Sequence, residues 1–241
     1  MKITIMANEM QFDRAAAMRI ISEMLAKPNS VISLATGNTT QNMYKIITGE
    51  YINAPWDTSE LRVFNVDEVM NVPRTPGKYC YSKIWDSFAK PIGIPESNVL
   101  MPDPLGDWVE ECKKTELMLK EVGGIDLQIL GIGENGHIGF NQPGTKFSQK
   151  VWVCPLLEEA ETRILSGLES KPIGGVAGFT LGITDIMRAR RIILMAKGSH
   201  KAQIIRQAVL GPISEDVPVS VLQLHPNCDL LLDASAAALL N

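Results

Sequence analysis

Three short segments of the sequence hold residues whose types and spacing suit chemistry on a small anionic molecule. The first spans residues 35–40 and includes Thr36, Gly37, Asn38, Thr39 and Thr40. Small residues let a backbone approach an anion closely, and the amides at the start of a helix donate hydrogen bonds to it. The pattern indicates a phosphate-binding loop, although a capped turn before a helix would use similar residues. Nucleotide hydrolysis by a P-loop is not indicated, because no Gly-Lys-Ser/Thr follows.

A pair of adjacent acids forms the second segment. Asp67 and Glu68 directly follow an apolar run at residues 62–66 that predicts a strand. An acid at the carboxyl end of a strand can be partly shielded from water, which raises its pKa toward that of a useful general base. Because the two side chains would point in different directions, we expect at most one of them to face a substrate. An acid that only caps a helix is the structural alternative.

The third segment, residues 131–144, is rich in glycine and places His137 between Asn135 and Gln142. It contains the G-x-G-x-x-G spacing of dinucleotide-binding folds. We reject that interpretation, because Gly139 and Pro143 interrupt the segment where the fingerprint requires a long helix. A single histidine is more often structural than catalytic. Here the many glycines around it indicate a backbone that packs closely against a ligand, which favours a role in chemistry.

Short apolar runs that alternate with segments of helical period must position these residues. Such alternation predicts an α/β protein with a mostly parallel sheet and helices on both faces. We expect strands at residues 2–6, 31–35, 62–66, 126–130, 191–196, 220–223 and 229–232. In such sheets ligands bind at the carboxyl ends of the strands, which is where all three segments lie.

Helices are predicted from apolar side chains at spacings of three and four residues. The first such stripe is Ala17, Ile20, Ile21 and Met24, and Asp13 is its expected N-terminal cap. A second helix is expected at residues 41–47. Two further stripes consist of Trp108, Cys112, Leu119 and Val122, and of Ile204, Ile205, Ala208 and Val209, the last ended by Gly211. We interpret all of these stripes as core-facing surfaces.

Composition excludes several classes of protein. The 241 residues are 45% hydrophobic and 21% charged with a formal net charge of −4. This composition is typical of an ordinary soluble globular protein and does not indicate a basic surface for binding nucleic acid. No apolar stretch has the length of a membrane helix, and residues 1–10 predict a strand rather than a signal sequence, so a cytoplasmic protein is expected. Glycine and proline are spread along the chain, which favours a single domain over residues 1–241.

The four cysteines, Cys80, Cys112, Cys154 and Cys228, are widely spaced and form no CxxC pair. Neighbouring histidines at the spacing of metal ligands are also lacking. We therefore expect buried, reduced thiols rather than disulfides or a zinc site.

Taken together, the three segments resemble the glucosamine-6-phosphate deaminase and isomerase family, and more closely its galactosamine-6-phosphate isomerase branch. The resemblance continues in order along nearly the whole chain, in residues 34–40, 64–68, 124–127 with 136–143, 198–202 and 222–226. Five ordered blocks are far more specific than any one of them.

The resemblance implies a Rossmann-like α/β fold and a reaction, without metal or cofactor, on a phosphorylated amino sugar. In that family the ring of a 2-amino-2-deoxyhexose 6-phosphate opens, a carboxylate moves a proton from C2 to C1, and the resulting imine loses ammonia to leave a ketose 6-phosphate. Carried over by motif, Asp67 is the proton-shuttling base and His137 assists ring opening. The implied phosphate and substrate ligands are Thr36, Gly37, Asn38, Thr39, Lys201 and Arg163.

Two positions depart from the glucosamine type of deaminase, which carries an Asp where this chain has Asn135 and a Glu where it has Gln142. The galactosamine branch also has an Asn at the first position, so Asn135 slightly favours galactosamine 6-phosphate over its glucosamine epimer. Gln142 keeps the reach of Glu but cannot exchange a proton. Two alternatives therefore stand beside the deaminase: a sugar-phosphate-binding protein with impaired catalysis, and a 6-phosphogluconolactonase, whose family shares the fold and the phosphate loop. The oligomeric state is left open.

Overall fold

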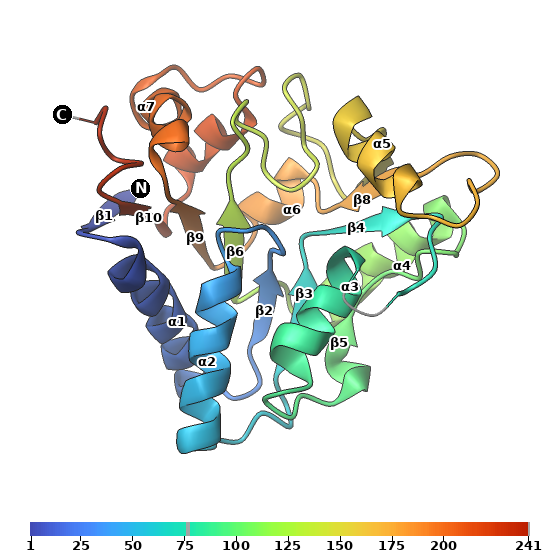
Figure 1. The fold of residues 1–241 in the computed structure, drawn as a ribbon, viewed down its shortest axis with the longest axis horizontal. Helices are drawn as coiled ribbons and strands as arrows, with labels where there is room; N and C mark the ends of the chain where they lie inside the picture. Colours follow the sequence, from blue (N-terminus) through green and yellow to red (C-terminus); the bar gives the residue numbers. More distant parts are fainter. Residues whose placement is uncertain (76–77, 241) are drawn as a thin grey trace.

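The computed structural model describes residues 1–75 and 78–240. Over these residues the chain forms a seven-stranded parallel sheet in the order β1-β10-β9-β6-β2-β3-β5 (Figure 1). The strands are β1 (Lys2–Met6), β2 (Val31–Leu34), β3 (Arg62–Asn65), β5 (Val99–Leu100), β6 (Leu127–Gly131), β9 (Arg191–Ala196) and β10 (Cys228–Asp233). The predicted mostly parallel sheet is confirmed, and the predicted strands agree with these bounds to within a residue or two, apart from residues 220–223.

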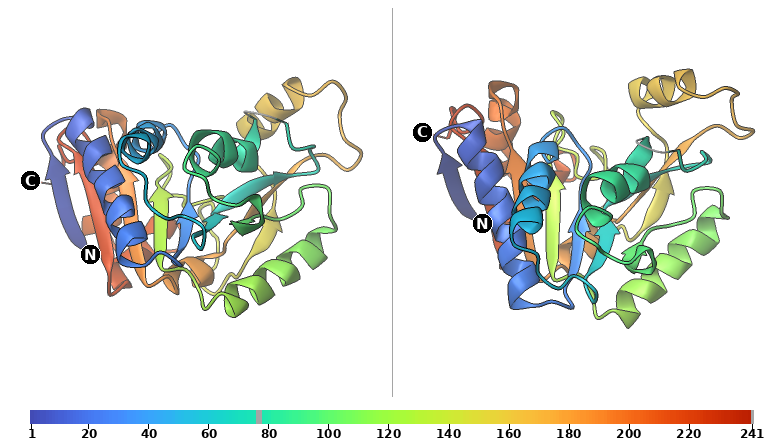
Figure 2. Two further views of the ribbon diagram at one scale, coloured as in Figure 1. Left: turned by 90° about the horizontal axis from the view of Figure 1, so that it is seen from below. Right: turned by 60° about the horizontal axis from the view of Figure 1, so that its bottom comes forward.

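Helices cover both faces of this sheet (Figure 2). One layer holds α1 (Glu9–Ala26), α2 (Gln41–Asn53), α3 (Tyr79–Ile84) and the π-helical turn η1 (Trp85–Ala89). The opposite layer holds α4 (Trp108–Glu121), α6 (Ile183–Met187), α7 (Ala202–Leu210) and the 3-10 helix η4 (Pro218–Leu224). Two shorter 3-10 segments are η2 (Glu96–Asn98) and η3 (Ser199–Lys201).

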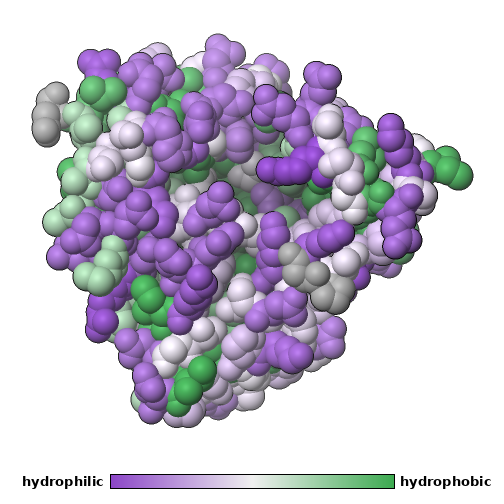
Figure 3. Space-filling model, in the orientation of Figure 1, coloured by the Kyte–Doolittle hydropathy of each residue, from purple (hydrophilic) through white to green (hydrophobic). Residues whose placement is uncertain are grey.

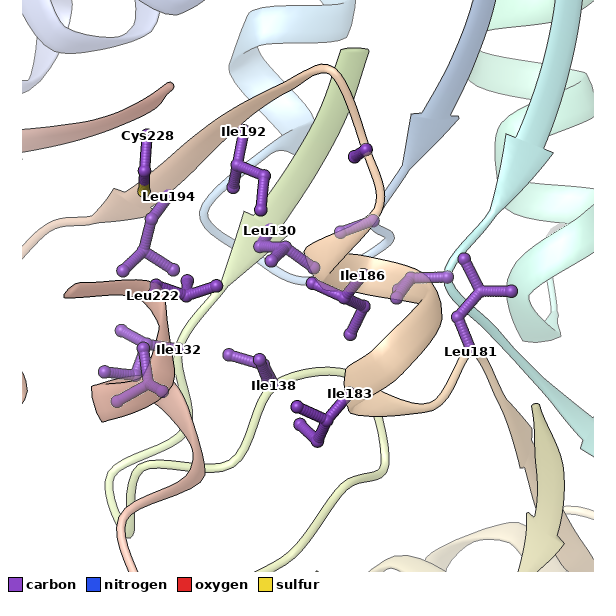
Figure 4. Packing of buried hydrophobic residues seen from close by; sticks show 14 of the residues in the cluster. Leu130, Ile132, Ile138, Leu181, Ile183, Ile186, Ile192, Leu194, Leu222 and Cys228 are labelled. Carbon is purple, nitrogen blue, oxygen red and sulfur yellow. The ribbon is translucent and has the colours of Figure 1, made fainter. Parts of the chain in front are cut away.

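The central strands are buried on both faces, and alternate residues therefore enter two separate cores. In β9, Ile193 and Met195 pack with the α1 layer. Ile192 and Leu194 point the other way and pack with Leu222 and with Ile186 of α6 (Figure 4). Apolar cores thus pack against both faces of the sheet, and this packing fixes the positions of the loops at its carboxyl edge.

A second, smaller sheet is antiparallel and was not predicted. It has the order β4-β8-β7, from β4 (Asp67–Met70), β8 (Ala177–Thr180) and β7 (Trp152–Cys154), and helix α5 (Glu158–Ser166) lies beside it. Its strands are three or four residues long, too short for an alternating apolar pattern to stand out. Ile164 and Leu165 of α5 pack against Val69 and Val176, which attaches the helix to this sheet.

Val66 connects the two sheets. β4 begins directly after it, and β3 ends directly before it. The N–H of Val66 donates to the carbonyl of Leu34 at 2.9 Å, and its carbonyl accepts from the N–H of Leu181 at 2.8 Å. The start of β4 is therefore fixed relative to the end of the neighbouring strand β2.

One predicted strand is wrong: residues 220–223 lie in the 3-10 helix η4. Pro218 occupies its first turn, where a missing N–H costs nothing. Ser220 accepts a hydrogen bond from the N–H of Ser214, and Gln223 donates to the carbonyls of Ala208 and Gly211. These polar side chains attach the segment to the end of α7, a contact that an apolar pattern does not reveal.

Asp13 is not the cap of the first helix. Helix α1 begins four residues earlier, where the side chain of Asn8 accepts the N–H of Gln11 at 2.9 Å. Asp13 instead lies buried inside the helix and contacts Asn42 at 3.1 Å and Lys197 at 3.4 Å. The apolar stripe located the helix correctly, but it does not mark the helix start.

The predicted burial of the cysteines is confirmed for three positions. Cys80, Cys154 and Cys228 are buried and free, and Cys112 is free and half-buried. Of the helices in residues 1–75 and 78–240, none has both the length and the apolar character that a membrane crossing requires. Among the same residues, no group of three or more His, Cys, Asp or Glu side chains is placed to bind a metal ion.

Candidate active site

A cleft of about 1180 Å³ opens at the carboxyl edge of β2, β3 and β6, between the two sheets. Figure 3 shows the hollow in this face of the molecule, bordered by hydrophilic side chains. Every site residue predicted from the sequence except Gln142 lines it, namely Thr36, Gly37, Asn38, Thr39, Asp67, Asn135, His137, Arg163 and Lys201. The topology thus brings together segments that lie far apart in the chain.

The loop after β2 has the form expected of an anion cradle. Gly37 faces open space, since a Cβ built on it would meet no atom within 4 Å. Helix α2 begins at Gln41, so the first N–H groups of this helix lack helical partners and are free to donate. Thr40 is structural instead: its hydroxyl donates to the carbonyls of Ala35 and Gly37, both at 2.9 Å.

Two cationic side chains line the cleft from different elements, Lys201 from η3 and Arg163 from α5. Lys201 is half-buried at the end of η3, directly before α7, and Arg163 is exposed on α5. Burial lowers the pKa of Lys201, and the nearby Glu134 carboxylate opposes that change. A partly desolvated cation beside the first turn of a helix is suited to binding a phosphate dianion.

Asp67 is held at the start of β4 with its carboxylate in the cleft. Burial is the main cause that raises the pKa of this carboxyl from its ordinary value to about 7, and the charge of Glu68 adds to it. The thiol of Cys80, 3.3 Å from Oδ1, and the charge of Lys83 act in the opposite direction. A carboxylate with this pKa can both accept and return a proton near neutral pH.

Glu68 points away from the cleft, as predicted for adjacent acids on a strand. It is buried, and it accepts the backbone N–H groups of Val69 at 2.8 Å, Cys80 at 3.0 Å and Tyr81 at 2.7 Å. These bonds hold the first turn of α3 against β4. Glu68 is therefore the structural member of the pair, and Asp67 is the member available to a substrate.

His137 is oriented by a pair of amides. Oδ1 of Asn135 accepts the backbone N–H of His137 at 3.2 Å and lies 2.7 Å from its Nδ1. Nδ2 of Asn135 donates to Oε1 of Gln142 at 3.0 Å, so Gln142 acts on the histidine through Asn135. A backbone N–H can only donate, which fixes the amide oxygen toward the histidine and requires Nδ1 to carry a proton. The neutral ring then leaves Nε2 as an acceptor.

The environment of His137 favours the neutral ring. Burial is the main cause that lowers its pKa, and the positive charge of Lys201 lowers it further. Asn135 supplies no negative charge that would stabilise the imidazolium. His137 is thus prepared to accept a proton through Nε2 near neutral pH.

Gly133 is required by the position of His137. A Cβ at residue 133 would lie 2.1 Å from Nδ1 and Cε1 of the imidazole, well inside contact distance. The N–H of Gly133 also donates to the carbonyl of His137 at 2.9 Å, which closes the turn. The dense glycines noted in the sequence therefore make room for the histidine itself.

Several residues of the cleft were not identified from the sequence. They are Lys78, Tyr79, Cys80 and Lys83 from the α3 region, Glu134 beside the histidine, and His200 beside Lys201. The α3 group follows Asp67 by more than ten residues and shares no motif with it. His200 lies inside one of the blocks of family resemblance, so its position there was the one available signal.

The family model described as "Glucosamine-6-phosphate isomerases/6-phosphogluconolactonase" matches residues 8–230. The chain belongs to this family. Proteins named glucosamine-6-phosphate deaminase from Clostridium botulinum (strain Loch Maree / Type A3) and from Halothermothrix orenii are each 38% identical to it over 245 residues. Both alignments cover the whole of this chain and 99% or 100% of the relative. The family resemblance inferred from the sequence is confirmed.

Solved structures of the family have the same fold. A monomeric glucosamine-6-phosphate deaminase of the NagB superfamily superposes with a TM-score of 0.90 at 31% identity, covering 99% of this chain and 100% of that one. The 6-phosphogluconolactonase from Trypanosoma brucei superposes with a TM-score of 0.76 at 22% identity, covering 100% of this chain and 98% of that one. The second likeness concerns the fold alone.

Proposed function

We propose that this protein is an isomerising deaminase of a 2-amino-2-deoxyhexose 6-phosphate, which it converts to a ketose 6-phosphate and ammonia. The observation that carries the proposal is that one cleft holds a phosphate cradle, an aspartate with a pKa of about 7 and a neutral histidine. The full-length relatives named as deaminases support it.

In the proposed reaction, residues 36–39 and Lys201 bind the phosphate, and Arg163 contacts the substrate from α5. Nε2 of His137 takes the proton of the C1 hydroxyl and returns it to O5 as the ring C1–O5 bond breaks, which gives the open aldehyde and the neutral imidazole again. Asp67 then removes the proton from C2, the 2-ammonium group of the substrate gives a proton to O1, and Asp67 returns its proton to C1. The product is an imine at C2, and water converts it to the ketone and ammonia.

The proposal is tested by incubating the purified protein with glucosamine 6-phosphate and measuring ammonia and ketose 6-phosphate together. We expect the two products to appear in equal amounts. Hydrolysis of 6-phosphogluconolactone, measured in parallel, is expected to be absent. Lactone hydrolysis without ammonia release would contradict the proposal and favour the lactonase alternative.

Galactosamine 6-phosphate is a second candidate substrate, favoured by Asn135. The two sugars differ only at C4, and one or two hydrogen bonds to that hydroxyl would discriminate between them. The relatives named as glucosamine-6-phosphate deaminases favour the gluco epimer. Comparison of kcat/KM for the two sugars on the same preparation decides between them.

The rate should depend on pH through Asp67. This carboxyl must be ionised to accept the C2 proton, and its pKa lies at about 7, so kcat/KM is expected to rise as the pH increases through about 7 and then to level off. The lowered pKa of His137 favours the neutral ring at neutral pH. Initial rates from pH 5 to 9, corrected for the ionisation of the substrate phosphate near 6, measure the profile. A midpoint near 4, the value of an ordinary aspartate, would contradict this assignment.

Introducing the two carboxylates of the glucosamine type at positions 135 and 142 tests the alternative hypothesis that the protein binds a sugar phosphate but has impaired catalysis. The amides of Asn135 and Gln142 already orient His137, so Asn135→Asp combined with Gln142→Glu is expected to change kcat by less than about tenfold, well below the roughly 10²–10⁴-fold contribution of a positioned general acid or base. Ammonia release and the binding of a non-reacting hexitol phosphate are measured on both proteins. A gain of several hundredfold in rate with unchanged binding would favour the binding-protein reading.

A further inference from the structure

The side chain of Cys80 lies between the phosphate loop and the proposed base. Its Sγ is 3.3 Å from Oγ1 of Thr36 on one side and 3.3 Å from Oδ1 of Asp67 on the other. The residue is buried at the first turn of α3, where Glu68 accepts its backbone N–H at 3.0 Å. The side chain of Cys80 is thus held between Thr36, which is assigned to phosphate binding, and Asp67, which is assigned to proton transfer.

The chemistry of the three groups fixes the direction of these hydrogen bonds. An ionised carboxylate can only accept, so the thiol of Cys80 must donate to Asp67. The sulfur then accepts from the hydroxyl of Thr36. A thiolate could not play this part, and burial together with the charges of Asp67 and Glu68 raises the pKa of Cys80 and keeps the thiol protonated.

We propose that Cys80 is a positioning residue that aims the carboxylate of Asp67 and couples it to the phosphate loop through Thr36. This inference rests on the proposed function of Asp67 as the base. The thiol of Cys80 donates its hydrogen bond to Oδ1 of Asp67. Oδ2 of Asp67 has no hydrogen bond to any residue in the described part of the chain. Oδ2 is therefore the oxygen that faces C2 of the substrate.

The relay also predicts that binding of a phosphate changes the pKa of Asp67. When the hydroxyl of Thr36 turns to a bound phosphate, the sulfur of Cys80 loses a donor, and the thiol becomes a weaker partner for Asp67. A carboxylate with a weaker donor is a stronger base. Occupation of the loop at one end of the sugar thereby raises the basicity of the group at the other end.

Other charged groups around Asp67 must stay constant in a test of this relay. Glu68 raises the pKa of Asp67, and Lys83 of α3 lowers it. Burial raises the pKa of Tyr44 in α2 and of Cys154 in β7, and the charge of Asp67 raises both further. Both groups therefore stay protonated near neutral pH. A substitution confined to Cys80 leaves all four in place.

The experiment follows the side-chain carboxyl carbon of Asp67 by carbon-13 NMR during a pH titration, with the resonance assigned by its loss in Asp67→Asn. In Cys80→Ala the donor is gone, and the pKa of Asp67 is expected to rise by roughly 0.5 to 1. In Cys80→Ser a hydroxyl donor is restored, and the pKa is expected to return to the wild-type value or below it. The matched control is Cys228→Ala, a buried cysteine of β10 outside the cleft, which should leave the titration of Asp67 unchanged.

Activity supplies the second readout, and it separates this inference from the proposed function. The rising limb of kcat/KM should move to higher pH in Cys80→Ala and return in Cys80→Ser. If wild-type protein released no ammonia, the proposed function would fail while the NMR titration would still decide whether the thiol of Cys80 sets the pKa of Asp67. An unchanged pKa of Asp67 in Cys80→Ala, or a serine variant that behaves like alanine, would overturn the proposal. Should Cys80→Ala not fold, a pKa in Cys80→Ser above that of wild type overturns it equally.

Discussion

Replacement of Asp67 by asparagine is expected to lower kcat by about 10²–10⁴-fold, the contribution typical of a positioned general base. The amide has almost the same shape as the carboxylate and can still accept from the thiol of Cys80. It cannot take the proton from C2. Loss of rate without loss of the fold is therefore the expected outcome.

Two measurements separate a lost base from a damaged site. Exchange of the C2 hydrogen with deuterated water should disappear together with ammonia release. Binding of an open-chain 2-amino-2-deoxyhexitol 6-phosphate, which cannot react, should change little, because the phosphate cradle does not include residue 67. If binding were lost in parallel with the rate, the assignment of Asp67 as the base would lose its support.

A suitable control is Asp185→Asn. Asp185 is also buried, and burial raises its pKa as well, but it lies in α6 outside the cleft. We expect this variant to retain nearly the full rate. The comparison distinguishes the position of Asp67 from the general effect of neutralising a buried aspartate.

The second large effect is expected for Gly133→Ala. The added methyl group would lie 2.1 Å from the imidazole of His137, so the ring must move and its 2.7 Å contact with Asn135 must break. A displacement of about 1 Å at a reacting group can cost about 10²-fold in rate, and we expect a fall in kcat of that size. Thermal unfolding recorded beside the kinetics shows how much of the change is stability.

Gly49→Ala is the control for the second prediction. Gly49 lies in α2, and a Cβ there would meet no atom within 4 Å. Alanine is the better helix former, so this variant should be at least as stable as wild type and equally active. Full activity of Gly133→Ala would show that His137 tolerates displacement and is not needed for ring opening.

The sequence was informative where function depends on segments that are continuous in the chain. The loop at residues 36–40, the acid after β3 and the glycine-rich turn around His137 each carry their residues within a few positions. Parallel strands place their carboxyl ends at one edge of the sheet, so three local motifs could be predicted to meet. The apolar stripe of α1 was predicted correctly, because apolar periodicity indicates burial. The stripe of α4 packs against the core but is only half-buried, and the buried residues of that helix are Glu111 and Thr115.

Features that depend on contacts between distant segments could not be predicted. Cys80 approaches Asp67 only because Glu68 binds the first turn of α3, and no spacing in the sequence encodes that contact. The small antiparallel sheet consists of strands too short to show a period. Residues 220–223 were misassigned since the side-chain bonds of Ser220 and Gln223, rather than the apolar pattern, decide their structure.

The connection through Val66 makes the site sensitive to the length of the sugar. Leu34 and Asn65 are paired across adjacent strands, whose axes lie about 4.8 Å apart. The phosphate loop follows Leu34 directly, and Asp67 follows Asn65 after a single residue, Val66. Because the hydrogen bond from Val66 to Leu34 fixes the start of β4 relative to the end of β2, the interval between phosphorus and the abstracted hydrogen is set by the backbone. On the proposed function, an amino sugar one carbon shorter would seat its phosphate and present the wrong carbon to Asp67. The fixed distance between the phosphate loop and Asp67 would therefore select substrates by the number of carbon atoms between the phosphate and the abstracted hydrogen.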